Sequence, residues 1–336
     1  MSDFQIKDLP ERTQSFWKIA GPGAVLVGLS IGAGEIIIWP SIVAEFGASM
    51  VWAAILGIFL QLWVNLEIGR WTIATGETAF TGFSRIWLGF GPLFLFLTVL
   101  ANVAPGWGRA SGLALKALIV GPAGYGSDTF WTVITFLIAA IILFGPNAIY
   151  KSVERSVEAL IIIVTLGLIS MAIAVGSSDT WYSLGKGIIN VGYRDPGISV
   201  KVLFSALVFA GAGGIYNLFY SFYLRDKNIG MGGRIPKMIN PLRGKGEAMP
   251  SKGFLFKENS ENLRRFSSWW NYVKKDQIIF FWALNTFTMI LFIFGALAVL
   301  YPRGIIPAAG SLIWDEAVVL GEVWGNPGRV IFLIVG

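Results

Sequence analysis

Long apolar stretches, separated by short polar segments, make up most of the 336-residue chain. Each stretch has at least about 20 residues, the length that an α-helix needs to cross a bilayer. The pattern predicts an all-α, multi-pass membrane protein with a single transmembrane domain, and a loop over 225–275. The predicted helices lie at about 17–46, 50–75, 88–119, 130–149, 155–176, 199–224, 276–301 and 312–336.

The two ends of the chain differ in polarity. Residues 1–18 are polar and charged, so they do not form a signal peptide. The last apolar run, 329–336, has no polar tail after it. We therefore expect the sequence to be a C-terminally truncated fragment of a longer protein.

Composition supports a membrane protein and argues against an enzyme. Only 14% of the residues are charged, whereas soluble domains have about 25%. The chain has no Cys and no His, which removes thiolate chemistry, the commonest general base and the commonest transition-metal ligand. We expect neither enzymatic activity nor a cofactor.

The distribution of basic residues predicts the orientation. Lys7, Arg12 and Lys18 precede the first helix, and 12 of the 26 Lys and Arg residues lie in 225–275. The segment 121–128 after the third helix has none. Because Lys and Arg concentrate on the cytoplasmic side, the N-terminus is predicted to be cytoplasmic, in the cell (plasma or inner) membrane, with 225–275 as a basic cytoplasmic loop.

Two glycine-rich clusters stand near the middle of apolar helices. Glycine in a helix interior costs about 1 kcal/mol relative to alanine, and paired Gly-interrupted helices are typical of secondary transporters. Close packing of small residues is the alternative. We predict that both helices are broken and form the substrate site. Its predicted residues are Gly32, Ala33, Gly34 and Glu35 in the first helix, and Ala210, Gly211, Gly213 and Gly214 in the sixth.

Polar side chains within the apolar stretches are further candidates. Glu35 is the carboxylate at mid-membrane, where a charge costs roughly 2.5–3.5 kcal/mol, so it is a candidate ligand, including for a metal; an ion pair between helices is the alternative. Arg109 either neutralises Glu35 or replaces a coupling ion; the alternative is that it pairs with another carboxylate or extends to the membrane interface. Asn65, Tyr216 and Asn217 line a pathway or make interhelical hydrogen bonds.

These residues belong to a wider resemblance. From Gly21 to Glu77 the chain resembles the first two helices of the Nramp family of divalent-metal transporters. Gly21-Pro22 is similar to the family's opening, and counting along places 32–35 on its Asp-Pro-Gly-Asn motif. Tyr150–Arg155 and Asn285 continue the similarity. The resemblance implies the inverted-repeat fold of the amino acid–polyamine–cation superfamily, with helices 1 and 6 broken and the second repeat incomplete here.

Several family ligands are replaced in this chain. The Asp of the first motif falls on Gly32 and its Asn on Glu35, while the family's Met-Pro-His falls on 213–215. Its backbone carbonyl in helix 6 would belong to Ala210. Two acidic positions of helix 3 fall on Gly106 and Arg109, which argues against the family's proton route.

The remaining oxygen ligands suit hard cations such as Mn²⁺ and Mg²⁺. The resemblance therefore implies a secondary transporter, a symporter in this family, that moves a divalent metal cation by alternating access. A transporter of an amine or amino acid, and a non-transporting receptor-like relative, are the alternatives.

The end of the 225–275 region interleaves basic and aromatic residues over 262–275. Such a pattern is typical of contact with anionic lipid, although positive-inside topology also explains the charge. The expected partners are thus the bilayer and a small ion or small molecule, and no nucleic acid.

Overall fold

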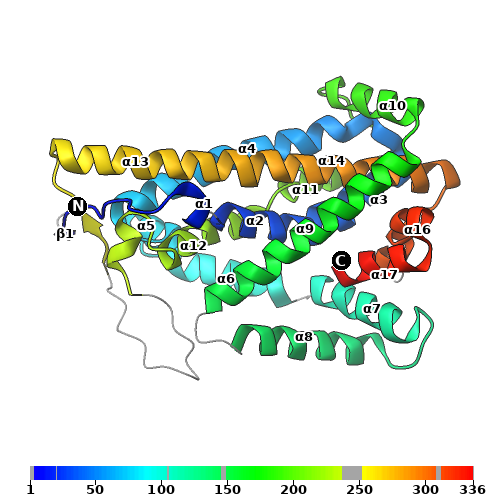
Figure 1. Ribbon diagram of the computed structural model, residues 1–336, viewed down its shortest axis with the longest axis horizontal. Helices are drawn as coiled ribbons and strands as arrows, with labels where there is room; N and C mark the ends of the chain where they lie inside the picture. Colours follow the sequence, from blue (N-terminus) through cyan, green and yellow to red (C-terminus); the bar gives the residue numbers. More distant parts are fainter. Residues whose placement is uncertain are drawn as a thin grey trace.

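The computed structural model describes residues 4–19, 21–103, 106–144, 149–236, 252–307 and 312–335. Parts of the predicted segments lie outside these ranges: 20, 104–105, 145–148, 237–251 and 336. Within the described ranges, helices are joined by loops. Two short strands, β1 (Gln5–Ile6) and β2 (Phe254–Leu255), pair in parallel. Figure 1 shows α4 (Val51–Thr75) and α13 (Ser260–Asp276) side by side along the molecule, while α9 (Ile149–Val175) runs obliquely to them.

The first helix is continuous through its glycine cluster, so the break predicted there is wrong. The backbone is π-helical over the cluster, and the α-helices before and after it follow without interruption. A π-turn is wider than an α-turn and is frequent at functional sites. The glycines are thus accommodated by a change of helical pitch. The elements are α1 (Phe16–Ile19), α2 (Pro22–Ser30), η1 (Ile31–Ile38) and α3 (Trp39–Phe46).

The second predicted helix lies close to its expected bounds. It is preceded by η2 (Gly47–Met50) and forms α4 (Val51–Thr75). It ends at Gly76, whose φ of 70° is left-handed and whose N–H donates to the carbonyl of Thr72. This is a common helix stop, because glycine adopts that conformation without steric cost.

The next helices include one that the hydrophobic pattern did not predict. The hydroxyl of Thr78 caps α5 by accepting from the Thr81 N–H. The predicted helix at 88–119 corresponds to α6 and α7, and α7 packs against α8. The bounds are α5 (Ala79–Ile86), α6 (Phe90–Val103), α7 (Gly106–Val120), α8 (Asp128–Phe144) and α9 (Ile149–Val175).

The sixth predicted helix is broken, as expected. Its two halves are separated by 209–213, which is not helical. A short helix that was not predicted, α10, precedes it. The bounds are α10 (Ser178–Ile189), α11 (Val200–Val208), η3 (Gly214–Phe219), α12 (Tyr220–Asp226) and η4 (Gly230–Arg234).

The last helices begin earlier and are more divided than predicted. The side chain of Asn259 caps a helix that starts at Ser260, so 260–275 is helical and continuous with the predicted segment. Gly325, with φ of 60°, separates the last two helices. The bounds are α13 (Ser260–Asp276), η5 (Gln277–Leu284), α14 (Asn285–Gly295), η6 (Ala296–Leu300), η7 (Tyr301–Arg303), α15 (Leu312–Glu316), α16 (Val318–Trp324) and α17 (Asn326–Val335).

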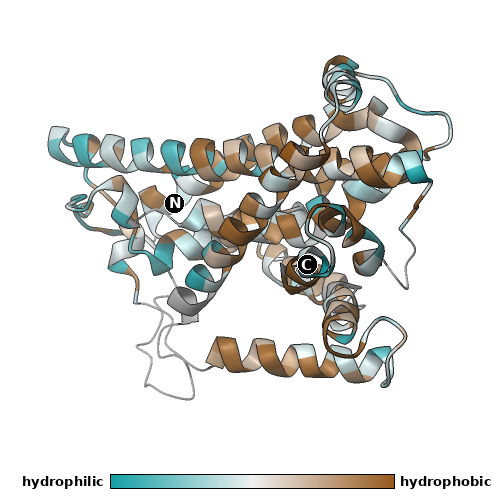
Figure 2. Cartoon of the chain, turned by 45° about the vertical axis from the view of Figure 1, so that its right-hand side comes forward, coloured by the Kyte–Doolittle hydropathy of each residue, from teal (hydrophilic) through white to brown (hydrophobic). Residues whose placement is uncertain are grey.

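Three helical stretches of the described residues are long and apolar enough to cross a membrane: Pro22–Thr75, Glu154–Val175 and Ser260–Arg303. Hydrophobic residues dominate the bundle in Figure 2, and hydrophilic ones gather at the first turns of α13. The chain is therefore a membrane protein by length and composition of its helices.

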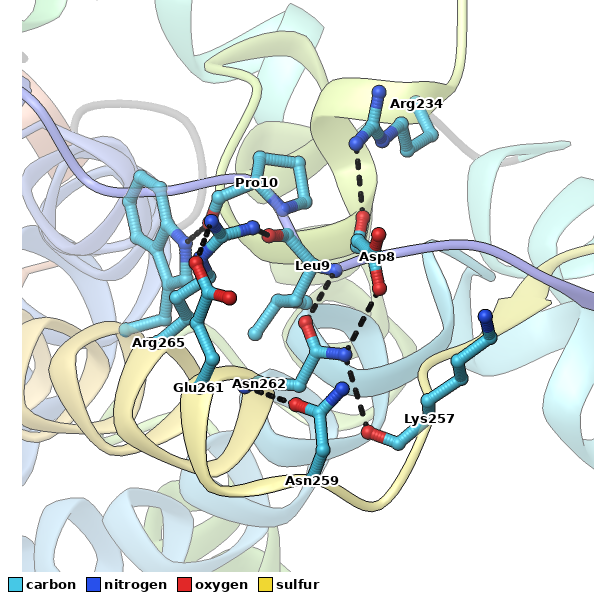
Figure 3. A network of polar contacts seen from close by, with 10 residues as sticks. Asp8, Leu9, Pro10, Arg234, Lys257, Asn259, Glu261, Asn262 and Arg265 are labelled. Carbon is cyan, nitrogen blue, oxygen red and sulfur yellow. Dashed lines mark hydrogen bonds and ion pairs between the residues drawn. The ribbon is translucent and has the colours of Figure 1, made fainter.

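The N-terminal segment 4–10, here called the strap, is tied to α13 (Figure 3). Leu9 is fully buried, and its N–H donates to Asn262 Oδ1 over 3.0 Å. Arg265 donates to the Leu9 carbonyl and Trp269 to the Pro10 carbonyl, each over 2.8 Å. Trp269 is thus buried against the strap, where the sequence predicted an aromatic residue for lipid contact.

Candidate functional site

The break in helix 6 is held by a polar side chain of α4. Gln61 Nε2 donates to the Val208 carbonyl over 2.9 Å, and Gln61 Oε1 accepts from the Gly213 N–H over 3.1 Å. The same Oε1 accepts from Asn217 Nδ2 over 2.9 Å. An unmade hydrogen bond in a buried site costs about 1–3 kcal/mol. Gln61 therefore supplies the partners that the interrupted helix has lost.

Glycines bring α4 and η1 into contact with this break. A Cβ at Gly34 would overlap the carbonyl oxygen of Phe209 and lie 3.4 Å from the Cα of Ala210. A Cβ at Gly57 would lie 2.9 Å from the Ala210 Cβ. The two glycine clusters predicted from the sequence are thus in contact, and only glycine permits this approach.

The turn itself requires glycine. Gly213 has φ of 82° and Gly214 has φ of 53°, both in the left-handed region that residues with a Cβ rarely adopt. A Cβ at Gly211 would lie 2.5 Å from Gln61 Oε1. The sequence motif therefore encodes both the turn and the space for Gln61.

Glu35 lies on η1 and is fully buried. Neither carboxyl oxygen has a hydrogen-bond partner among the described residues. Thr288 of α14 lies against this carboxyl group, but its hydroxyl donates to the Leu284 carbonyl. Since an isolated buried carboxylate is very costly, an ionised Glu35 requires a cation. No basic side chain of the described residues pairs with Glu35, so the interhelical ion pair is not formed there.

Amide side chains supply further buried oxygens. Asn65 follows Gln61 by one turn of α4, and neither its oxygen nor its nitrogen is hydrogen-bonded to a described residue. Asn217 Oδ1 and Asn285 Oδ1 are also buried and have no partner in the described ranges, although Asn285 Nδ2 donates to Ser30 Oγ over 3.3 Å. Carbonyl and amide oxygens are ligands for hard cations. Buried amide side chains on α4, η3 and α14 thus carry acceptors with unused capacity, and α14 packs against η1.

Arg109 is not brought to Glu35. Its guanidinium pairs with Asp128 over 3.1 Å, and its side chain is 62% exposed. Lys116 also approaches Asp128, at 3.6 Å. The structure therefore shows the alternative reading of Arg109, a pair with another carboxylate.

Three other predicted site residues are Gly32, Ala33 and Tyr216. Gly32 has open space where a Cβ would stand, and Ala33 contributes backbone to η1. Tyr216 is half-buried and its ring meets Phe219 edge-on at 5.7 Å. In the part of the chain that the structure describes, no group of three or more acidic, His or Cys residues could hold a metal. Any cation here would depend on Glu35 and neutral oxygens.

Sequence reasoning missed Gln61 and Thr288. Gln61 could have been noticed, because it is a polar residue one turn before Asn65 in an apolar helix. Thr288 gave no such signal, because threonine is common in membrane helices and bonds its own backbone.

No protein-family model and no curated protein matches the chain. Solved structures do match. A mutant form of the Eremococcus coleocola manganese transporter is 15% identical, with a TM-score of 0.56, over 100% of this chain and 72% of that chain. The same transporter in complex with an aromatic bis-isothiourea substituted compound is 15% identical, with a TM-score of 0.52, over 100% of this chain and 73% of that chain. These structures are of a transporter and not of an enzyme, and the chain described here has their fold.

Proposed function

We propose that the protein is a secondary active transporter that moves a hard divalent cation, Mn²⁺ or Mg²⁺, by alternating access. The observation that carries this proposal is the fully buried carboxyl group of Glu35, which has no hydrogen-bond partner among the described residues. It lies on η1, which touches the break of helix 6 through Gly34. The fold shared with manganese transporters supports it.

The residues have distinct roles in this proposal. Glu35 supplies the negative charge, and backbone carbonyls freed by the interrupted helix over 209–213 supply neutral ligands. Gln61 positions that backbone. A cation held by one carboxylate keeps part of its water shell, as Mg²⁺ usually does. The expected substrate site comprises Gly32, Ala33, Gly34, Glu35, Ala210, Gly211, Gly213 and Gly214, with Asn65, Tyr216 and Asn217 along the pathway.

The membrane context belongs to the same proposal. The N-terminus is proposed to face the cytoplasm of a cell-membrane protein built on inverted repeats. Contact with anionic lipid would involve the exposed residues of α13, namely Leu263, Arg264 and Lys275, because Trp269 and Tyr272 are buried.

One observation favours a second candidate function. Glu35 is the acidic residue of η1, and no cluster of acidic residues is found among the described residues. A single carboxylate balances the charge of an organic amine without a second anion. Transport of an amine or amino acid is therefore the competing function.

Uptake into proteoliposomes tests the proposal. We expect the full-length protein to take up Mn²⁺ or Mg²⁺, and Glu35→Gln to abolish uptake because the charge is lost while the shape is kept. Glu45→Gln is the control, since Glu45 is an exposed residue ten positions along the same helical stretch. Folded protein that takes up neither ion would contradict the metal proposal, and uptake of amines would then be measured.

A further inference from the structure

A second buried carboxyl group stands apart from the predicted site. Glu316 is the last residue of α15 and is 1% exposed. Neither of its carboxyl oxygens has a hydrogen-bond partner among the described residues. Glu316 therefore shares the unusual state of Glu35 but belongs to another helix.

The helix that carries Glu316 packs against the element that carries Glu35. α15 packs against η1, which carries Glu35, and against α7, α16 and α17. Both carboxyl groups are buried on helices that pack together, and charges in such a low-dielectric interior interact strongly.

The charged residues of these neighbouring elements have other partners. On α7, Arg109 and Lys116 both approach Asp128. On α16, Glu322 pairs with Arg303 over 2.6 Å. No described basic side chain pairs with Glu316.

Two further charges complete these surroundings. On α17, the Arg329 guanidinium lies 5.5 Å from the centre of the Trp314 ring. Asp315, next to Glu316 on α15, has the same sign and repels a second negative charge there. An ionised Glu316 is therefore unfavourable as long as the site on η1 is empty, and the neutral, protonated carboxyl group is the favoured form.

Binding of a divalent cation changes this balance. Glu35 is equally buried and unpartnered among the described residues, so it also gives its proton to water when the cation binds. Its carboxylate neutralises one of the two positive charges, and a buried excess of one positive charge remains. Loss of a proton from Glu316 would supply the second negative charge. By linkage, the cation then weakens proton binding and the proton weakens cation binding to the same degree.

We propose that Glu316 is a proton-binding site whose proton is displaced when a divalent cation binds at Glu35. This inference rests on the proposed function. The carboxyl group of Glu316 loses its proton to water, and its carboxylate balances the charge of the cation. Mutual exclusion of proton and cation gives exchange of the two, in contrast to the symport that the Nramp resemblance implies.

Proton release on binding is the direct test. Mn²⁺ is added to purified full-length protein in weakly buffered detergent solution. A calorimeter measures the binding, and a pH-sensitive dye, in a separate experiment, measures the protons released. We expect Glu316→Gln to release about one proton fewer per bound ion than the wild type, and its Mn²⁺ affinity to depend less on pH. Glu316→Asp keeps a carboxyl group and should restore the release, which a merely structural role would not predict. Glu45→Gln should release as many protons as the wild type. Equal release by Glu316→Gln and the wild type would overturn the inference.

A second measurement separates this inference from the proposed function. Infrared spectroscopy detects the protonated carboxyl group without any cation. A band of the wild type at neutral pH that is missing in Glu316→Gln shows that the proton is there. If the band is present but neither Mn²⁺ nor Mg²⁺ binds, the proposed function and the displacement by metal are refuted, while the proton site stands. Absence of the band would overturn the proton site itself.

Discussion

The side-chain oxygen Oε1 of Gln61 lies 2.9 Å from Nδ2 of Asn217. Through this bond, α4 holds the segment that follows the break in helix 6. The same oxygen accepts from the Gly213 N–H, and Gln61 Nε2 donates to the Val208 carbonyl before the break. One amide side chain thus spans the interruption, which explains how unwound backbone is stable in an apolar bundle.

Gln61→Ala should destabilise the protein and impair uptake. It leaves the Val208 carbonyl, the Gly213 N–H and Asn217 Nδ2 without their partner, at about 1–3 kcal/mol for each group that water does not reach. We expect a clearly lower midpoint of thermal unfolding in detergent. Gln14→Ala, at an exposed position, is the control and should unfold as the wild type does. Equal stability of both variants would show that Gln61 does not hold the break.

Gly34→Ala should be far more damaging than Gly32→Ala. The added Cβ at Gly34 meets the carbonyl oxygen of Phe209, which is backbone and cannot rotate away, whereas nothing lies within 4 Å of a Cβ at Gly32. Overpacking of this kind costs typically 1–3 kcal/mol. Thermal unfolding of the two variants measures the difference. If both unfold alike, η1 and helix 6 do not make this contact.

The broad architecture could be predicted from the sequence because its signal is strong. Apolar runs of membrane length mark helices such as α4, and the glycines at 213 and 214 mark the break in helix 6. The glycines of the first helix carry the same signal, yet the chain forms the π-helix η1 there. A glycine run lowers helix propensity but does not decide between unwinding and a change of pitch, since packing against neighbours decides.

Side-chain partners could be predicted less well. Glu35 was found because a mid-membrane carboxylate is rare. The partner of Arg109 was not found, because Asp128 comes near it through the packing of α7 against α8. The buried state of Glu316 and the strap over α13 also arise from contacts between distant segments. Such contacts leave no local pattern in the sequence.

Arg85→Ala should destabilise the protein by about 3–5 kcal/mol, because it leaves a buried carboxylate uncompensated. Glu77 has a side chain only 2% exposed and receives hydrogen bonds from Arg85 over 2.8 and 2.5 Å. In the variant, the Glu77 carboxylate would keep the hydrogen bond that it accepts from the Gly253 N–H. The matched control is Arg70→Ala, whose side chain is 59% exposed and pairs with the exposed Glu67; it should change stability by less than about 1 kcal/mol. Similar losses in both variants would contradict this contrast.

Asn262→Ala should release the strap from α13. Asn262 is 1% exposed, accepts from the Leu9 N–H over 3.0 Å and donates to the Asp8 carboxylate over 3.1 Å. Its loss leaves the buried Leu9 N–H without a partner, which should lower the free energy of unfolding by about 1–3 kcal/mol.

The absence of native cysteines permits a direct readout of this release. A single cysteine introduced by Leu9→Cys is fully buried in the intact strap and should react slowly with a maleimide. Adding Asn262→Ala should speed labelling several-fold, because the strap then detaches more often. Asn271→Ala, at an exposed position of the same helix, should leave the labelling rate unchanged. Equal rates in the Asn262 and Asn271 variants would show that the strap is held by its apolar contacts and not by the Asn262 side chain.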